Sequence, residues 1–328
     1  MRTLPACLVL LFALTASVVL AAPPSAQKRL SRRAETGQLV DELLEGRLAV
    51  PTAISRLRIL REDAYAASLL IRAASDVVEP RLLRDVTAVL AGLEVRSAEA
   101  TLVELTGHQD GAVRMYAVQG LGRLRSRRVD VLLPLLEDKS LGVRREVARA
   151  LGATHEPRVG KALLSTARTE ADPQTRVLLL EAVGAAGDKK QAPGLKAFLD
   201  DSSESTRFSA ARGLCLLGAP EGFAFARKLL GSEDKHVRRQ GLALYEGLPV
   251  KLSQTALRPL LEDKDRTLAA GAARILHQGG DKSMLGWLVL ASWKANGEEK
   301  LAYEKELETL HLADDERKAL LRKAGMVK

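Results

Sequence analysis

The sequence contains little of what a disulfide-bonded or β-rich protein requires. Only two cysteines occur in 328 residues, and aromatic residues make up 3% of the chain. Because Cys7 lies in a segment that we expect to be removed, Cys215 would remain alone and could form no intramolecular disulfide. The apolar residues are mostly Ala, Leu and Val, which favours helices over strands.

Motifs of common enzyme classes are also absent. The sequence has no nucleophile elbow, no phosphate-binding loop and no dinucleotide-binding fingerprint. Its five histidines are spread along the chain without the spacing of metal ligands. We therefore expect no catalytic residue, no metal and no cofactor.

The first residues are typical of a secretory signal peptide. They carry Arg2, a mostly apolar run from Leu8 to Leu20, and small residues at the end of that run. The run is short for a membrane span of about 20 residues. We expect residues 1–21 to be cleaved and the protein to be exported, to a periplasm or alternatively to the extracellular medium. Residues 22–36, rich in Pro, Ser and Arg, are predicted to be a disordered leader.

One motif recurs along the chain every 30 to 32 residues. Aligned on an arginine, its copies carry apolar residues one before, three after and seven after, which define one face of a helix. A polar residue four before the arginine is a natural N-cap. A shorter apolar segment precedes each copy, so each repeat holds two helices. The repeated acidic and basic residues are Asp110, Arg114, Arg144, Asp172, Arg176, Arg207, Asp234 and Arg238.

Glycine follows the arginine by eight residues in the first three copies. We predict that Gly122, Gly152 and Gly184 mark the ends of these helices. The fourth copy has Cys215 at this position. A small buried thiol is the main interpretation of Cys215, and a redox or ligand-linking thiol is the alternative.

The segment from Leu132 to Gly152 resembles a HEAT repeat. Its first helix ends in Leu-Leu, an Asp-containing turn follows, and Val-Arg opens the second helix. The period of about 31 residues is similar to the short HEAT-like class named after phycobilin lyases. The resemblance implies an all-α fold, a right-handed α-solenoid (an α-α superhelix of the armadillo or HEAT type). It covers residues 97–290, with helices or degenerate repeats over 37–96 and a helical cap over 291–328.

The resemblance also implies roles for the repeated residues. The repeated Asp and Arg would form a structural ladder between turns, and the second helix of each repeat would line a concave surface. Positions one and five after the arginine point away from the buried face. They suit an acidic, partly apolar peptide, although a solvated face is the alternative. The candidate binding residues are Arg145, Arg149, Arg212, Arg239, Arg274, Met115 and Phe208.

The sequence thus predicts an exported scaffold or adaptor that binds a protein or peptide and catalyses nothing. A ligand chaperone or lyase of the phycobilin-lyase type is one alternative, and it requires a reactive, accessible thiol. A purely structural component of the cell envelope is another. The net charge of +9 allows contact with an anionic envelope surface. The arginines of the loop 123–128 could contact a phosphate or glycan, but a solvated loop is the main interpretation. Export and the scarcity of aromatic residues argue against nucleic acid.

Overall fold

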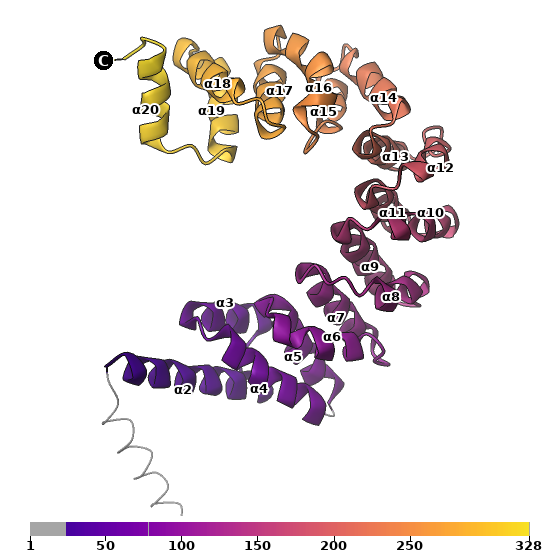
Figure 1. Cartoon of the computed structure of the whole chain (residues 1–328), viewed down its shortest axis with the longest axis vertical. Coiled ribbons are helices and arrows are strands. Elements are labelled where there is room, and N and C mark those ends of the chain that lie inside the picture. The colour runs from indigo at the N-terminus through magenta and orange to yellow at the C-terminus, as the bar shows by residue number, and fades with distance from the viewer. Residues whose placement is uncertain (1–23, 78, 328) are drawn as a thin grey trace, which may run out of the picture. The chain divides into compact units, whose positions relative to one another are not determined.

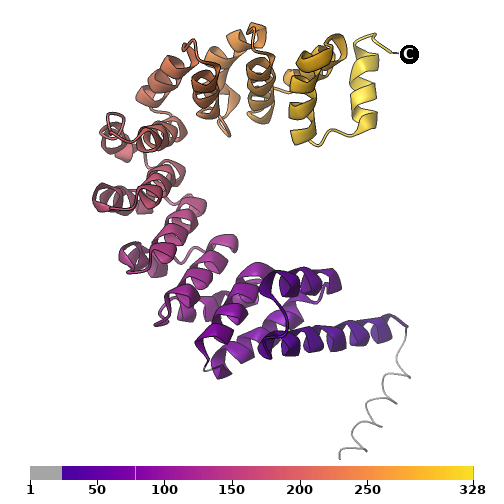
Figure 2. The same cartoon turned by 180° about the vertical axis from the view of Figure 1, so that it is seen from behind.

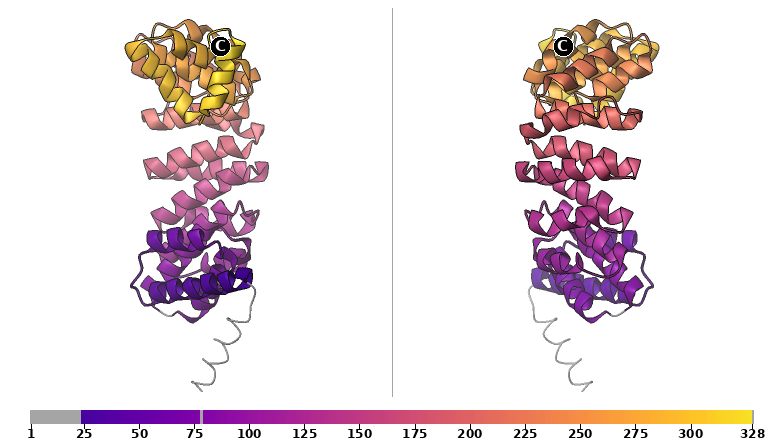
Figure 3. Two further views of the ribbon diagram at one scale, coloured as in Figure 1. Left: turned by 90° about the vertical axis from the view of Figure 1, so that its left-hand side faces the viewer. Right: turned by 90° about the vertical axis from the view of Figure 1, so that its right-hand side faces the viewer.

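The computed structural model describes residues 24–77 and 79–327, and in these ranges it contains helices and turns but no strand. The predicted signal peptide, Cys7 and residues 22 and 23 lie outside them. The chain divides into two compact units, residues 1–154 and 155–328. Within each unit, helix pairs stack on one another (Figures 1 and 2), and the helices lie across the direction of stacking (Figure 3). The all-α helical-repeat solenoid is confirmed.

Unit 1 holds the N-terminal helices and the first repeats. Its elements in chain order are α2 Pro24–Leu44, α3 Val50–Leu60, α4 Asp63–Asp76, α5 Pro80–Leu93, η1 Arg96–Ala98, α6 Glu99–Leu105, α7 Gly111–Arg123, α8 Val129–Leu132, η2 Leu133–Glu137 and α9 Leu141–Thr154.

Unit 2 holds the later repeats and the C-terminal helices. Its elements are η3 Pro157–Val159, α10 Gly160–Thr169, α11 Pro173–Ala186, η4 Lys189–Gln191, α12 Ala192–Lys196, α13 Glu204–Leu217, α14 Pro220–Leu230, α15 Lys235–Ala243, α16 Val250–Leu257, η5 Arg258–Glu262, α17 Arg266–Gln278, α18 Ser283–Lys294, α19 Gly297–Thr309 and α20 Asp314–Lys323. The predicted cap boundary at residue 291 falls inside α18.

The helices that carry the repeated motif are α7, α9, α11, α13, α15 and α17, and we call them the second helices. The apolar face predicted for them is buried: Val113, Ala117 and Leu121 of α7 have no exposed surface. The predicted N-caps also accept hydrogen bonds from backbone N–H groups in the first turn. This is seen for Asp110, Asp172, Ser203, Asp234 and Asp265.

The prediction of a disordered leader was wrong for residues 24–36, which belong to α2. The polar residues of this segment have partners in the helices behind it. Arg33 donates to the Glu62 carboxylate at 3.3 Å, and its guanidinium carbon lies 5.0 Å from the centre of the Tyr65 ring. Leu39, further along α2, is buried. The prediction failed because it rested on composition. A helix that packs on its neighbours through charged residues can have the same composition as a disordered segment.

The prediction that glycines end the second helices was also wrong. Helix α7 continues past Gly122 to Arg123, and α11 continues past Gly184 to Ala186. A Cβ atom on Gly184 would lie 2.4 Å from the Cα atom of Gly213 in α13. These glycines therefore allow neighbouring second helices to approach at backbone distance.

We predict that Gly184→Val lowers the free energy of unfolding by about 1–3 kcal/mol, because the new side chain must push α11 and α13 apart. Urea unfolding followed by circular dichroism measures the change. Gly37→Ala is the control, since nothing lies within 4 Å of its Cβ position. It should leave stability unchanged or raise it by about 0.5–1 kcal/mol. A Gly184→Val chain as stable as the wild type would contradict the packing role.

Candidate functional site

The repeated arginine makes the same hydrogen bond in successive repeats. Its guanidinium donates to the backbone carbonyl of the residue six positions earlier, in the turn before the second helix. Carbonyls in such a turn have no partner within the helix, so the arginine satisfies one of them. The pairs are Arg114 to His108 (2.7 Å), Arg144 to Asp138 (2.9 Å), Arg176 to Glu170 (2.7 Å), Arg207 to Asp201 (2.7 Å) and Arg238 to Ser232 (3.1 Å).

The same turn residue is linked to the preceding repeat. The Asp138 carboxylate accepts from the Ser140 backbone N–H at 2.7 Å and from Arg114 at 2.7 Å through both of its oxygens. Arg114 and Asp138 are each only 7% exposed as side chains. Looser pairs join Arg176 to Asp201 and Arg238 to Asp263, each at 3.9 Å. Arg114, Arg176 and Arg238 therefore link their repeats to the next one. Of the ladder residues, Arg207 alone lines one of the three hollows described below.

Asp110 is the N-cap of α7 and also pairs with Arg84 of α5. The hydrogen bond from Arg84, helped by the backbone N–H groups of Ala112 and Val113, lowers the pKa of Asp110 to about 2. The ionised carboxylate is the form that binds both helices.

The arginines of the predicted basic stripe interact with other residues of the chain. Arg274 lies between the carboxylates of Glu246 and Glu306, and the side chain is only 15% exposed. Arg145 is half-buried on α9. Much of the charge of the stripe is thus compensated, by the same helix for Arg149 and by neighbouring repeats for Arg239 and Arg274. The other contacts are Arg149 to Glu146 (2.5 Å), Arg212 to the Leu244 carbonyl (3.0 Å) and Arg239 to Asp265 (3.3 Å).

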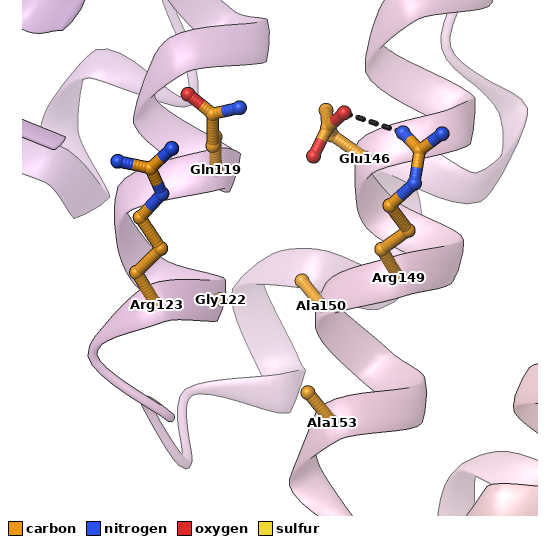
Figure 4. Close-up of a pocket in the computed structure, with 7 residues that line it drawn as sticks. All are labelled: Gln119, Gly122, Arg123, Glu146, Arg149, Ala150 and Ala153. Carbon is orange, nitrogen blue, oxygen red and sulfur yellow. Dashed lines mark hydrogen bonds and ion pairs between the residues drawn. The ribbon is translucent and has the colours of Figure 1, made fainter. Parts of the chain in front are cut away.

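Unit 1 has a hollow of about 240 Å³ between α7 and α9. Figure 4 shows Gln119 and Arg123 projecting from α7, opposite Glu146 and Arg149 on α9. The floor is formed by small residues, among them Ala150. Arg123 is exposed and makes no ion pair with another described residue, so it is the cation of this hollow that is available to a partner.

Unit 2 has a larger hollow, of about 530 Å³, lined by second helices. A second hollow of about 240 Å³ adjoins it, because Glu204, Phe208 and Gln240 line both. We call the two together the α13–α15 groove. Its remaining lining residues are Val177, Glu181, Ser205 and Ser209 in the larger hollow and Arg207, Phe225, Lys228, Leu229 and Val237 in the smaller.

The groove exists because a packing rule of the repeats fails there. In neighbouring second helices, the residue eight positions after the arginine of one helix contacts the residue six positions after the arginine of the next helix. Both residues are small. The contacts between such pairs are Gly122 with Ala150 and Gly184 with Gly213. Ala91 meets Gly120 in the same way, although Leu83 stands at the arginine position of α5.

At the next step the corresponding residues are Cys215 and Leu244, and Leu244 is far too large for the same approach. Helices α13 and α15 accordingly make little direct contact, and each packs instead on α14. Two glycines tighten these contacts: a Cβ atom on Gly222 would lie 2.7 Å from the Cys215 backbone nitrogen, and one on Gly241 would lie 2.8 Å from that of Leu230. The gap between second helices is thus built into the sequence.

Of the apolar candidates, Phe208 lines the groove, whereas Met115 is half-buried on α7 and lines none of the hollows described above. Cys215 is fully buried, and burial raises the pKa of its thiol to about 12. A thiol in this setting is neither ionised nor accessible. Among the described residues no three His, Cys, Asp or Glu side chains are arranged to hold a metal ion. No helix in those ranges is long and apolar enough to cross a membrane.

Comparison with known proteins agrees with this geometry. Residues 98–184 and 160–245 match the family model of HEAT repeats. Residues 98–245 carry HEAT repeats. No curated protein matches its sequence.

Solved structures share the fold at low identity. The complex of CpcE and CpcF of phycocyanin lyase from Nostoc sp. PCC7120 has a TM-score of 0.51 and 19% identity, and the match covers 74% of this chain and 94% of that chain. This likeness shows the fold alone. An engineered protein matches with a TM-score of 0.46 and 18% identity over 94% of this chain and 90% of that chain. Human deoxyhypusine hydroxylase matches with a TM-score of 0.33 and 17% identity over 76% and 97%. Neither of the last two supports an argument.

We predict that Asp110→Asn destabilises the protein at pH 7, and that the difference from wild type disappears as the pH falls from about 4 to about 2. Asparagine keeps the N-cap and removes the charge, so the variant isolates the pair with Arg84. Because the folded pKa is lowered, the stabilisation is complete above the ordinary pKa of Asp and is lost below it. Urea titrations across this range measure it. Asp130→Asn, whose side chain is 66% exposed, is the control, and equal pH dependence of both variants would refute the assignment.

We also predict that iodoacetamide at pH 8 leaves Cys215 unmodified in the native chain and alkylates it once guanidinium chloride unfolds the protein. Mass spectrometry of the peptide containing Cys215 distinguishes it from Cys7. Native alkylation at the rate of an exposed thiol would show that the thiol is accessible and would revive the ligand-linking interpretation.

Proposed function

We propose that this protein is an exported HEAT-repeat scaffold or adaptor that binds a protein or peptide through its second helices and catalyses no reaction. One observation carries the proposal: the largest hollow described in unit 2 is lined entirely by second helices, α11, α13 and α15. Its half-buried Phe208 stands among polar side chains, which is the composition of a recognition surface. We propose export to the periplasm, or alternatively to the medium, because residues 1–21 resemble a signal peptide.

The unit 1 hollow supports the same kind of function. Arg123 offers an uncompensated guanidinium beside a shallow floor of small residues, which suits a carboxylate on a partner. This keeps an acidic partner segment within the proposal for unit 1.

The lyase-like alternative is less well supported. The phycocyanin lyase subunits share the fold, but transfer or redox chemistry at a thiol requires an accessible thiolate. Cys215 has no exposed surface and a pKa of about 12. A purely structural envelope component would have no defined partner at the groove, so the same experiment tests it.

A photoreactive benzophenone amino acid at position 205, in the full chain expressed in its host, tests the proposal. Ser205 is exposed and lines the groove. We expect illumination to yield one discrete cross-linked species that is lost in the Phe208→Ala background. The same amino acid at Ser55, exposed on α3, is the matched control and should not capture that species.

Equal cross-linking from positions 205 and 55, or none from position 205, would contradict recognition at the groove. Thermal melting of the Phe208→Ala chain must match wild type for the comparison to be valid. Fractionation of the same cells tests export.

A further inference from the structure

Resting on the proposed function, we propose a partner class for the α13–α15 groove: a peptide that presents a Lys or Arg next to a large apolar side chain. The larger hollow takes the cation and the smaller one takes the apolar side chain.

The smaller hollow supplies an apolar socket. Phe208, Phe225, Leu229 and Val237 line it, and all four are half-buried, so each still exposes apolar surface. An aliphatic or aromatic side chain inserted there would remove that surface from water. Anchors of this kind in well-packed pockets provide most of the binding free energy of many interfaces.

The larger hollow supplies uncompensated negative charge. Glu204 accepts a hydrogen bond from Gln240 at 3.0 Å, and Glu181 accepts one from Ser209 at 3.4 Å. Among the described residues no Lys or Arg pairs with either carboxylate. The two carboxylates therefore bring to one hollow negative charge that no basic side chain of the described residues neutralises. A Lys or Arg side chain of a partner could form ion pairs with both carboxylates.

The positive groups of the groove line only its smaller hollow. Arg207 donates to the carbonyls of Asp201 and Ser202 at 2.7 and 2.9 Å and is held in the ladder. Lys228 is exposed on α14 and lines only the smaller hollow. Glu181 of α11 thus lines only the larger hollow, Lys228 of α14 lines only the smaller one, and Glu204 of α13 lines both. This difference in charge favours a peptide whose basic residue lies in the larger hollow.

A random peptide library displayed on phage, panned against the full chain, tests the inference. We expect enrichment of sequences with Lys or Arg next to Leu, Ile, Met or Phe. In the double variant Glu181→Gln and Glu204→Gln the preference for the basic residue should fall at least tenfold, while the apolar residue stays enriched. Glu298→Gln with Glu308→Gln removes the same charge from exposed positions on α19 and should leave the enrichment unchanged.

The outcomes separate the partner class from the proposed function. Enriched peptides that depend on Phe208 but are acidic or lack a basic residue would overturn the partner class and leave recognition at the groove standing. A preference for basic residues that persists in the double Gln variant overturns the partner class as well. If no peptide depends on Phe208 and position 205 captures no partner, the proposed function itself fails.

Discussion

The stack depends on the hydrogen bond from each repeated arginine to the carbonyl six residues before it. That hydrogen bond stabilises the turn that connects the first helix of a repeat to the second. Where the turn residue is an aspartate, its carboxylate also receives the arginine of the preceding repeat, as Asp138 receives Arg114. The pair is buried, and loss of one partner from such a pair typically costs about 3–5 kcal/mol. A turn with such an aspartate is thereby linked both to its own helix and to the preceding repeat.

A second constraint decides where the surface can open. Second helices pack closely through pairs of small residues, such as Gly184 with Gly213. Cys215 and Leu244 break this rule, and α14 fills the back of the space that results. The candidate site thus lies at a step of the stack that lacks the pair of small residues. Its lining residues, such as Phe208, lie on the exposed face of second helices. The buried face of the same helices carries the apolar residues that recur in every repeat.

The sequence predicted the repeat period, the buried helix faces and the N-caps, because these follow from spacing along a single helix. It did not predict the partners of the stripe arginines. Arg274 meets Glu246 and Glu306, which lie 28 and 32 residues away, and single-helix reasoning cannot pair such positions. It also misjudged Gly184, whose role is a contact with another helix. One residue in the sequence indicates the groove, namely Leu244 at a position where other repeats have a small residue. Its significance becomes clear only from the structure, which shows that small residues at this position allow neighbouring second helices to pack closely.

Hydrogen exchange of the full chain, with and without the partner captured at position 205, tests recognition at the α13–α15 groove. We expect slower exchange of backbone amides in residues 204–209 of α13 and 235–240 of α15, with no change in α3. Protection confined to other helices, with those two segments exchanging at their free rates, would contradict recognition at the α13–α15 groove.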